Sequence, residues 1–399
     1  MDIEKEIERQ FNIIIQKAEE VFPKEELYNK IKKSIVEKRP LKVKFGIDPT
    51  GTELHLGHAV PLRKLREFQD LGHEVNLIIG TFTAKIGDPT GKNETRKMLT
   101  DEEIRENLKT YLEQASKILD IKKLKVLYNG DWLAKLTFTN LIEILSHFTV
   151  SQMTSREDFA NRLKNNIPVS LVELMYPMMQ GYDSVEMHAD IELGGMDQKF
   201  NLLRGRDLQR AFNQEQQVCL VFPILEGTYG KEKMSKSLNN YIGVTEKAND
   251  IFGKIMSIPD SLILTYFKLT TNRSIKEVEQ LRDEVSQNPF EMKKRLGEEI
   301  VRFYHSKDEA KKAREYFEAV FSKKEIHEEI RELILNQNIS LLELVVKENE
   351  VSKSEARRLI LAGAVKINNE KAENTDKIIE PNNQIIKIGK KNIFKIIKG

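Results

Sequence analysis

The sequence predicts an α/β protein with a Rossmann-like parallel-sheet domain at residues 1–245, an α-helical domain at 246–330 and a small domain at 338–399. Three observations lead to this fold class. Strand, helix and strand patterns follow one another within about 40 residues, as in a βαβ unit. The predicted strand at residues 74–80 is nearly all apolar at its end, a pattern that suits a parallel sheet covered on both faces. Helical periodicity replaces them after residue 246, and lysine-rich sequence follows near Ser340.

Length and composition limit the class of protein. A chain of 399 residues is too long for a single core, so two or three domains are expected. Its 40% apolar and 32% charged residues are typical of a soluble globular protein, with no apolar run that suits a membrane span. The single cysteine, Cys219, excludes an internal disulfide framework and a cysteine-rich zinc site. We therefore expect a cytoplasmic protein with no membrane partner and no structural metal.

The charge is unevenly distributed along the chain. Residues 351–399 hold 11 Lys and Arg against 5 Asp and Glu, a net charge of +6. Since the whole chain carries +2, the first 350 residues carry 2 − 6 = −4. A basic end on a near-neutral body suggests a polyanionic partner, and a solvated lysine-rich tail is the alternative.

The first elements of the predicted sheet lie in the first 120 residues. Residues 1–38 have helical periodicity with a break at Pro23, and residues 41–47 alternate as a strand. Turn residues at 48–51 end this strand, a helix follows at 57–71, and residues 74–80 form a second strand. Pro61 falls in the first turn of its helix, where it is acceptable, and Thr100 can cap a helix at 101–119.

The remaining elements follow in the same way. Residues 124–128 and 218–222 are predicted strands, and residues 185–193 are predicted to be extended. Helical patterns cover residues 132–148, 170–183 (despite Pro177) and 246–321.

Two imidazoles lie three residues apart where the helix after the first strand begins. Ligands of a doubly wound sheet bind at the carboxyl ends of its strands, and a helix start attracts phosphate. His55 and His58 can donate hydrogen bonds to phosphate oxygens, and Gly57 between them leaves room for adenine or ribose. A metal-binding pair is a weaker alternative, because no further ligands are grouped nearby. A second alternative is that His55 and His58 are two ordinary surface histidines.

The motif KMSKS stands at residues 233–237, about 175 residues downstream of HLGH at 55–58. Lys233 and Lys236 flank a short Gly- and Ser-rich loop, where two ammonium groups can bind the β and γ phosphates and neutralise the leaving pyrophosphate. Alone, the motif could be an exposed charged loop. With the histidine motif, it indicates a nucleotide site that activates a carboxylate with ATP. Residues 87–91 (GDPTG) lack the spacing of a Walker loop.

Three polar residues mark one face of the predicted helix at 170–183. Tyr176, Gln180 and Asp183 are spaced i, i+4 and i+7. Their convergence in a core is costly unless a polar ligand meets them. A polar core cluster whose hydrogen bonds are satisfied within the protein is the alternative.

Together these motifs resemble the class I aminoacyl-tRNA synthetases, and specifically the bacterial tyrosyl-tRNA synthetases, essentially from end to end. The resemblance is carried by residues 45–50 (FGIDPT), 55–58 (HLGH), 86–92 (IGDPTGK), 176–183 (YPMMQGYD), 195–201 (GMDQKFN) and 233–237 (KMSKS). The full KMSKS with DQKFN is similar to one subgroup of these enzymes. The resemblance implies a class I catalytic domain with an internal connective insertion, ATP with Mg²⁺ as substrate complex, L-tyrosine, tRNA(Tyr) as acceptor, and a homodimer.

The resemblance also implies roles for individual residues. Phosphate contacts would come from Thr50, His55, His58, Lys233 and Lys236. Other parts of the ATP site would be Gly46, Asp48, Gly57 and Asp197 (on the ribose), with Lys92 and Arg96 assisting from a mobile loop. The tyrosine α-amino group would meet Asp88, Tyr176 and Gln180. Asp183 would accept a hydrogen bond from the phenol, and Gln198 would lie near the substrate carboxylate.

This chain departs from the family pattern at three positions. Many members have a tyrosine where this chain has Lys44, and that tyrosine contacts the phenol. Many have a cysteine at Phe45, contacting the ribose. Met196 replaces a residue that is commonly small. Lys44 is therefore expected either to be a different partner for the phenol or to point away from the site.

The C-terminal parts also resemble family domains. Residues 246–321 are similar to the helical domain that contacts the anticodon arm. Residues 338–399 resemble a small αL RNA-binding fold shared with a ribosomal small-subunit protein, through SKSEARRLI at 352–360 and GAVKIN at 363–368. The RNA-binding residues would be Lys353, Arg357, Arg358 and Lys366, whose phosphate contacts would be salt-sensitive. RNA shape and unpaired bases would supply specificity.

The function we expect is ATP-dependent ligation of tyrosine to tRNA. Three other functions remain open at this point: activation of tryptophan by the sister enzyme, RNA binding by a non-catalytic paralogue, and small-molecule adenylyl transfer. The intact His55, His58, Lys233 and Lys236 argue against a non-catalytic protein, and Asp183 favours a phenol over an indole.

Overall fold

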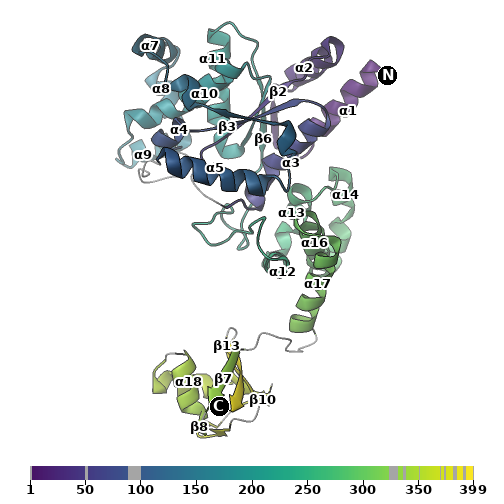
Figure 1. Cartoon of the computed structure of the whole chain (residues 1–399), viewed down its shortest axis with the longest axis vertical. Coiled ribbons are helices and arrows are strands. Elements are labelled where there is room, and N and C mark those ends of the chain that lie inside the picture. The colour runs from purple at the N-terminus through teal and green to yellow at the C-terminus, as the bar shows by residue number, and fades with distance from the viewer. Residues whose placement is uncertain are drawn as a thin grey trace. The chain divides into compact units, whose positions relative to one another are not determined.

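The chain forms two units, residues 1–314 and 315–399, which we describe separately. The computed structural model (Figure 1) describes residues 2–49, 53–88, 100–322, 331–335, 338–349, 351–368, 370–372, 374–380, 384–389 and 392–398. The predicted boundary at residue 245 falls inside the first unit. The division of that unit into a catalytic and a helical domain therefore stays a prediction.

The first unit is built on a six-stranded sheet in the order β1-β6-β5-β2-β3-β4. The pairs between β6, β5, β2, β3 and β4 are parallel, and β1 runs antiparallel to β6. The strand bounds are β1 Glu20–Phe22, β2 Lys42–Ile47, β3 Glu74–Ile79, β4 Leu124–Tyr128, β5 Ile191–Gly195 and β6 Val218–Phe222. The parallel sheet with its helices confirms the predicted α/β class.

Burial explains why these strands were readable from sequence. Every residue of β6 is buried, and so is every residue of β3 after Glu74. Figure 1 shows helices on both sides of the sheet, so both faces of these strands meet apolar side chains. The helices of this part are α1 Ile3–Ile15, α2 Lys24–Glu37, α3 Leu56–Asp70, α4 Thr83–Ile86, α5 Asp101–Ala115, α6 Gly130–Leu133, α7 Phe138–Ser146, α8 Val150–Thr154, α9 Glu157–Lys164, α10 Leu171–Met187 and α11 Lys199–Ala211.

The strand order defines a topological switch point between β2 and β5. From β2 the chain adds β3 and β4 on one side, then returns to add β5 and β6 on the other. Helices that follow such strands leave in opposite directions, and the crevice between them is where ligands of this fold class bind. The segments after β2 and β5 therefore line the expected site.

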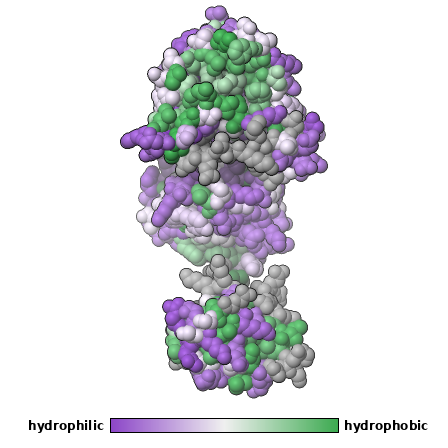
Figure 2. Space-filling view, turned by 90° about the vertical axis from the view of Figure 1, so that its left-hand side faces the viewer, coloured by the Kyte–Doolittle hydropathy of each residue, from purple (hydrophilic) through white to green (hydrophobic). Residues whose placement is uncertain are grey.

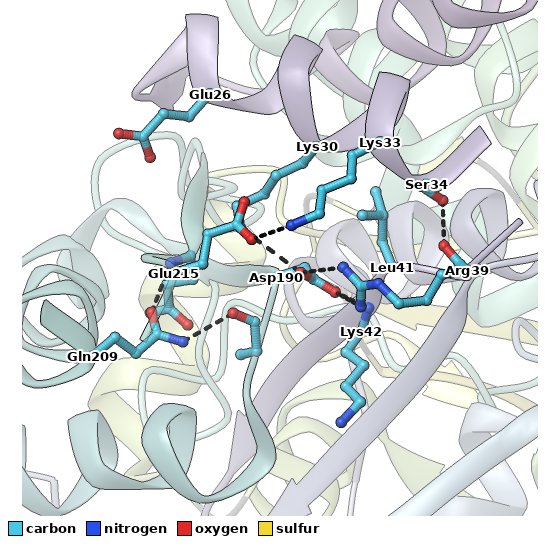
Figure 3. Close-up of polar contacts among 12 residues, drawn as sticks. Glu26, Lys30, Lys33, Ser34, Arg39, Leu41, Lys42, Asp190, Gln209 and Glu215 are labelled. Atoms are coloured by element: carbon cyan, nitrogen blue, oxygen red, sulfur yellow. Dashed lines mark hydrogen bonds and ion pairs between the residues drawn. The ribbon is translucent and has the colours of Figure 1, made fainter. Parts of the chain in front are cut away.

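The amino ends of β2 and β5 are joined by an ion-pair cluster at the other end of these strands (Figure 3). Asp190, just before β5, accepts hydrogen bonds from the Lys42 backbone N–H at 2.9 Å and from the Arg39 guanidinium at 2.9 and 3.1 Å. Lys30 of α2 lies 3.7 Å from Asp190 and 3.3 Å from Glu215. These contacts fix the register of the two strands that flank the switch point.

Helices complete the first unit after residue 245. They are α12 Ala248–Ser257, α13 Ile263–Thr270, α14 Ile275–Gln280, α15 Arg282–Gln287 and α16 Pro289–Tyr304. α17 Lys307–Phe317 follows and runs past the unit boundary at residue 314, and these helices confirm the helical prediction for this segment. α16 packs on α12 and α13, and Gly297 of α16 allows this because a Cβ there would lie 2.9 Å from the Phe252 ring.

The second unit has its own sheet and core. The strands β10 Glu370–Lys371, β9 Val365–Ile367, β12 Ile385–Ile388, β13 Asn392–Lys398 and β7 Arg331–Leu335 form one sheet in that order, and β11 Ile378–Ile379 pairs with β8 Ile339–Ser340. α18 Leu341–Asn349 and α19 Lys353–Leu361 bury Leu344 and Ile360 in a core with Ile386 and Ile396. β7 lies before residue 338, so this unit includes residues upstream of the predicted start.

Several element predictions were inaccurate at their ends. The helix predicted at 101–119 ends at Ala115, and the helical stretch at 132–148 is two helices, α6 and α7, of which α7 begins at a Thr137 cap. Residues 185–187, predicted to be extended, belong to α10, which continues until His188 takes a left-handed conformation with φ 52°. β1 was not predicted, because a run of three residues has no readable periodicity.

Within the described residues, the helices are too short or too polar to cross a membrane.

Candidate active site

The two predicted histidines meet where β2 gives way to α3. His55 is the N-cap residue of α3 with extended φ and ψ of −122° and 172°. Its ring stacks on that of His58, with centroids 3.8 Å apart, and its backbone N–H donates to His58 Nδ1 at 3.4 Å. Since His58 Nδ1 accepts, the neutral ring carries its proton on Nε2. The pair is therefore a preformed hydrogen-bonding corner at a helix start.

Both histidines are neutral at physiological pH. Burial lowers the pKa of His55 to about 2, and the neighbouring His58 lowers it further. Burial also lowers the pKa of His58 to about 4, helped by the positive charge of Lys233. His55 Nδ1 is buried and has no hydrogen-bond partner within the described part of the chain. These imidazoles offer hydrogen bonds to a ligand and carry no fixed charge.

Gly57 brings the histidine corner against the lysine loop. A Cβ on Gly57 would lie 3.0 Å from His55 Nδ1 and 3.6 Å from the Met234 Cβ. The lack of a side chain therefore spares the His55 ring a tight contact, and the buried Met234 lies within ordinary contact distance of the same position. Gly46, at the end of β2, is exposed and a Cβ there would meet open space.

The lysine loop is anchored on both sides of its motif. The Met234 N–H donates to Leu225 O at 2.8 Å, and the buried Asn240 side chain accepts from Ser235 N–H at 2.8 Å and donates to Lys233 O at 3.1 Å. Further on, Ile242 O accepts from Leu56 N–H at 2.9 Å. The loop is thus bonded directly to the helix start that carries the histidines.

The two lysines of this loop are half exposed and weakly paired. Lys233 Nζ lies 3.8 Å from Asp197 Oδ2, and Lys236 Nζ lies 3.1 Å from Glu53 Oε2, with 50% and 58% of the two side chains exposed. Exposed pairs of this kind contribute little stability, so both ammonium groups are available to an anionic ligand. Burial raises the pKa of Asp197, and Lys233 opposes that rise.

The predicted polar face of α10 is present, with Tyr176 and Asp183 buried and Gln180 half-buried. Tyr176 Oη donates to Asp48 Oδ2 at 2.8 Å, and Gln180 Nε2 donates to Glu192 Oε1 at 3.2 Å. Asp183 accepts from Trp132 Nε1 at 2.8 Å and from Asn129 Nδ2 at 3.3 Å.

Burial raises the pKa of Asp183 to about 7, against the lowering effect of Lys44 and these two hydrogen bonds. The face thus presents a carboxyl group whose charged form is disfavoured by burial and only partly restored by its neighbours.

A hydrogen-bond chain joins this face to the end of β2. Asn129 Nδ2 also donates to Thr83 Oγ1 at 3.0 Å, and Thr83 Oγ1 donates to Asp48 Oδ1 at 2.8 Å. Gly80 makes this possible, since a Cβ there would lie 1.9 Å from Asp48 Oδ1. Sequence reasoning missed Thr83, Asn129 and Trp132, which lie on segments with no recognisable motif.

A second chain links the residues after β5 to Asp88. Gln198 Nε2 donates to Asp88 Oδ2 at 2.7 Å, and Asn201 Nδ2 donates to Gln198 Oε1 at 2.9 Å. Arg156 donates to Asn201 Oδ1 at 3.0 Å and lies 3.5 Å from Asp88 Oδ1. Asn201 Nδ2 also donates to Gln180 Oε1 at 3.0 Å, so hydrogen bonds connect Asp88, Gln198 and Gln180. Arg156 was also missed.

Three predicted residues, Thr50, Lys92 and Arg96, lie outside the described residues. Among the residues that are described, no group of three or more His, Cys, Asp and Glu side chains could hold a metal ion.

The predicted RNA-binding residues of the second unit lie on α19 and β9. Lys353, Arg357 and Arg358 are exposed, and Arg358 pairs with Glu355 at 2.6 Å. Ala356 and Ile360 on the opposite face of α19 are buried in the core. α19 therefore presents a basic outer face, and the half-buried Lys366 lies on the following strand.

The class I aminoacyl-tRNA synthetases are defined by a Rossmann-like sheet that carries a His-x-Gly-His corner and a KMSKS loop. Both motifs lie at one switch point of the sheet. Residues 36–322 match the family described as "tRNA synthetases class I (W and Y)", and residues 341–385 match the S4 domain. The chain belongs to this class I family and, within it, to the bacterial tyrosine–tRNA ligases.

The relatives carry this narrower assignment. The tyrosine–tRNA ligase of Carboxydothermus hydrogenoformans is 49% identical over 98% of both chains. That of Thermotoga maritima is 47% identical, again over 98% of both. Among solved structures, the tyrosyl-tRNA synthetase of Archaeoglobus fulgidus complexed with L-tyrosine has a TM-score of 0.62 at 23% identity. It covers 77% of this chain and 99% of its own, a likeness of fold.

Proposed function

We propose that the described site forms tyrosyl-adenylate from L-tyrosine and ATP, releases pyrophosphate, and transfers tyrosine to the 3′ end of tRNA(Tyr). The tyrosine carboxylate attacks the α-phosphate, so no covalent enzyme intermediate is required. The tRNA terminal ribose then attacks the adenylate. The observation that carries the proposal is the contact of the histidine corner with the lysine loop beside the polar face of α10.

The ATP-binding residues act by position and charge. His55 and His58 donate hydrogen bonds to phosphate oxygens, and Lys233 and Lys236 neutralise the pyrophosphate as it leaves. Because the imidazoles are neutral, the loop lysines supply the charge. The open space beside Gly46 suits the approach of the nucleotide. The remaining assignments for ATP are Asp48, Gly57, Asp197 with the ribose, Thr50, Lys92 and Arg96. Mg²⁺ enters as part of the ATP substrate complex.

The tyrosine-binding residues lie along α10 and its partners. Asp88, Tyr176 and Gln180 bind the α-amino group, and Gln198 lies near the carboxylate. Asp183 accepts the phenol hydrogen bond, supported by the donors Trp132 and Asn129 that hold its orientation. An unpaired acceptor at Asp183 would disfavour phenylalanine.

The assay that tests this function is pyrophosphate exchange with purified protein. We expect exchange that requires tyrosine and is not supported by tryptophan or phenylalanine. Exchange driven by tryptophan would assign the chain to the other branch of its family. No exchange with any of the three would contradict the catalytic role of the histidine corner.

The rest of the chain serves tRNA. We assign residues 246–330 to contact with the anticodon arm as a domain separate from residues 1–245. Residues 338–399 bind RNA through Lys353, Arg357, Arg358 and Lys366. The exposed basic face of α19 supports this assignment, since phosphate contacts need exposed cations. Because the tRNA and ATP substrates are those of translation, we place the enzyme in the cytoplasm.

We also propose that the enzyme is a homodimer, and that its interface lies on α7, α8 and the start of α10. Leu171, Phe138 and Val150 on these helices are 81%, 78% and 74% exposed, and Ile142 is exposed beside them. Figure 2 shows apolar surface gathered on this side of the first unit. An exposed apolar patch of this kind marks a surface that binds another molecule. We assign a second copy of the chain as that partner, because most soluble oligomers are symmetric homo-oligomers.

Light scattering tests the dimer. We expect a mass of two chains for the native enzyme and of one chain for the Phe138→Glu, Val150→Glu variant. A native mass of one chain would contradict the assignment.

A further inference from the structure

Lys44 is a charged side chain in the middle of the sheet. It is 0% exposed, and its ammonium group has a partner for each of its three protons. Nζ lies 3.0 Å from Glu192 Oε1 and donates to Gln180 O and Ser184 Oγ, both at 2.7 Å. Lys44 therefore points from β2 towards α10, and groups of the protein itself occupy its ammonium.

Glu192, on β5, completes the arrangement from the other side of the switch point. Its Oε1 accepts from Gln180 Nε2 at 3.2 Å, and its Oε2 accepts from Ser184 Oγ at 3.1 Å. The second atom of the Gln180 amide, Oε1, accepts from Asn201 Nδ2 at 3.0 Å. Gln180 is thus held at its backbone carbonyl by Lys44 and at its amide by Glu192 and Asn201, which fixes the orientation of the amide.

The same ion pair acts on Asp183, one turn further along α10. The charged and titratable groups that face Asp183 are Lys44 on β2, Glu192 on β5 and Tyr176 on α10 itself. Lys44 favours the carboxylate form and Glu192 opposes it, with Lys44 the stronger of the two. Removing Lys44 alone would leave two buried carboxyl groups facing one another without this cation.

We propose that Lys44 is a positioning residue for tyrosine recognition, which fixes Gln180 together with Glu192 and places its positive charge against Ser184, the neighbour of Asp183 on α10. The inference rests on the proposed function, in which Gln180 and Asp183 bind tyrosine. Buried ion pairs are weak evidence for stability, because desolvation offsets their attraction. The ion pair of Lys44 and Glu192 is bonded to Gln180 and lies near Asp183, so its location suits a role in the recognition of tyrosine.

The test compares Lys44→Met with Lys42→Met by tyrosine-dependent pyrophosphate exchange. Lys42 lies two residues earlier on the same face of β2, and its Nζ donates to Met187 O at 3.2 Å, away from Gln180. In Lys44→Met we expect the KM for tyrosine to rise about tenfold or more, since hydrogen bonds to charged groups are lost. The KM for ATP should change much less. In the pH profile of kcat/KM for tyrosine, the apparent pKa of the acidic side should rise by about one unit. Lys42→Met should behave as the native enzyme.

Several outcomes would overturn the proposal. A folded Lys44→Met enzyme with native KM for tyrosine and a native apparent pKa on the acidic side would show that the pair is only structural. If Lys44→Met does not fold, the double variant Lys44→Met, Glu192→Gln decides the matter, because it leaves no unpaired buried charge. A raised KM for tyrosine in the double variant supports the proposal, and a native KM overturns it.

Two further variants separate this inference from the proposed function. Gln180→Ala and Asp183→Asn remove the presumed tyrosine contacts directly. If they leave tyrosine binding and the rejection of phenylalanine unchanged, the assigned tyrosine site is wrong. If they impair both while Lys44→Met does not, only the role of Lys44 is wrong.

Discussion

At the scale of single residues, burial sets which side chains of the site carry charge. Burial makes His55 and His58 neutral. It also raises the pKa of Asp183 to about 7, although the partners of Asp183 oppose this rise. Lys233 and Lys236, in contrast, remain half exposed on the loop. In the proposed reaction, the positive charge that balances pyrophosphate therefore comes from a surface loop, whereas tyrosine is bound by the buried, oriented groups.

This division predicts the effect of Lys236→Ala. We expect kcat for tyrosyl-adenylate formation to fall by roughly 10²-fold, because a group that stabilises developing charge is removed. The KM for tyrosine should stay close to native, since Lys236 lies away from the polar face of α10. Single-turnover adenylate formation measures both values. Lys231→Ala, which removes an exposed cation from the same loop, is the control, and equal losses in the two variants would contradict a specific role for Lys236.

At the scale of elements, the sequence predicted those parts whose signal is local. β3 and β6 show as apolar runs, β2 shows as an alternating strand, and α10 shows its polar face through its i, i+4, i+7 spacing. Element ends depend on caps such as Thr137 or on a single left-handed residue such as His188, which periodicity does not report. The partners of Asp183 and Lys44 could not be predicted, because Trp132 and Glu192 come from separate segments that only the folded sheet brings together.

The anchoring of the lysine loop gives a prediction for Asn240→Ala. This buried side chain bonds to Ser235 N–H and Lys233 O, so its loss frees both sides of the motif. We expect kcat for pyrophosphate exchange to fall about tenfold, because misplacing a catalytic group is costly, with the KM for tyrosine unchanged. Asn249→Ala, at an exposed position on α12, should have no effect. A native kcat in Asn240→Ala would show that the loop is positioned by other contacts.

At the scale of the whole molecule, buried histidines make stability depend on pH. Burial lowers the pKa of His73 from 6.5 to about 4. Its Nδ1 accepts from Leu41 N–H at 3.3 Å, and its Nε2 faces Gln10 Oε1 at 3.2 Å, which suits the neutral ring. The unfolded chain binds the extra proton between these two pH values, so the stabilising contribution is complete above the unfolded pKa and is lost as pH falls towards the folded one.

For His73→Gln we therefore expect a weaker pH dependence of unfolding. The native protein should lose about 2 kcal/mol more than the variant between about pH 7.5 and 5. Denaturant unfolding at the two pH values measures the difference, with the exposed His147→Gln as control. Equal pH dependence in the native protein and His73→Gln would show that His73 is not held neutral by the fold.

The two units also predict a separation of the two reaction steps. The residues that we propose for adenylate formation all belong to the first unit, whereas the basic face of α19 belongs to the second, which has its own core. For the double variant Lys353→Glu, Arg357→Glu we expect unchanged pyrophosphate exchange and a KM for tRNA in aminoacylation that rises by about tenfold or more. The salt dependence of tRNA binding should also become shallower, because each lost phosphate contact reduces the slope by about 0.7–0.9.

The matched control reverses the same amount of charge elsewhere on the second unit. Lys347→Glu with Lys377→Glu changes two exposed lysines away from α19. If this control weakens tRNA use as much as the α19 variant, net charge alone attracts the tRNA and the assignment of α19 is wrong. If the α19 variant also loses pyrophosphate exchange, the second unit contributes to adenylate formation. If only aminoacylation by the α19 variant suffers, the basic helix face is where the second unit binds the tRNA backbone.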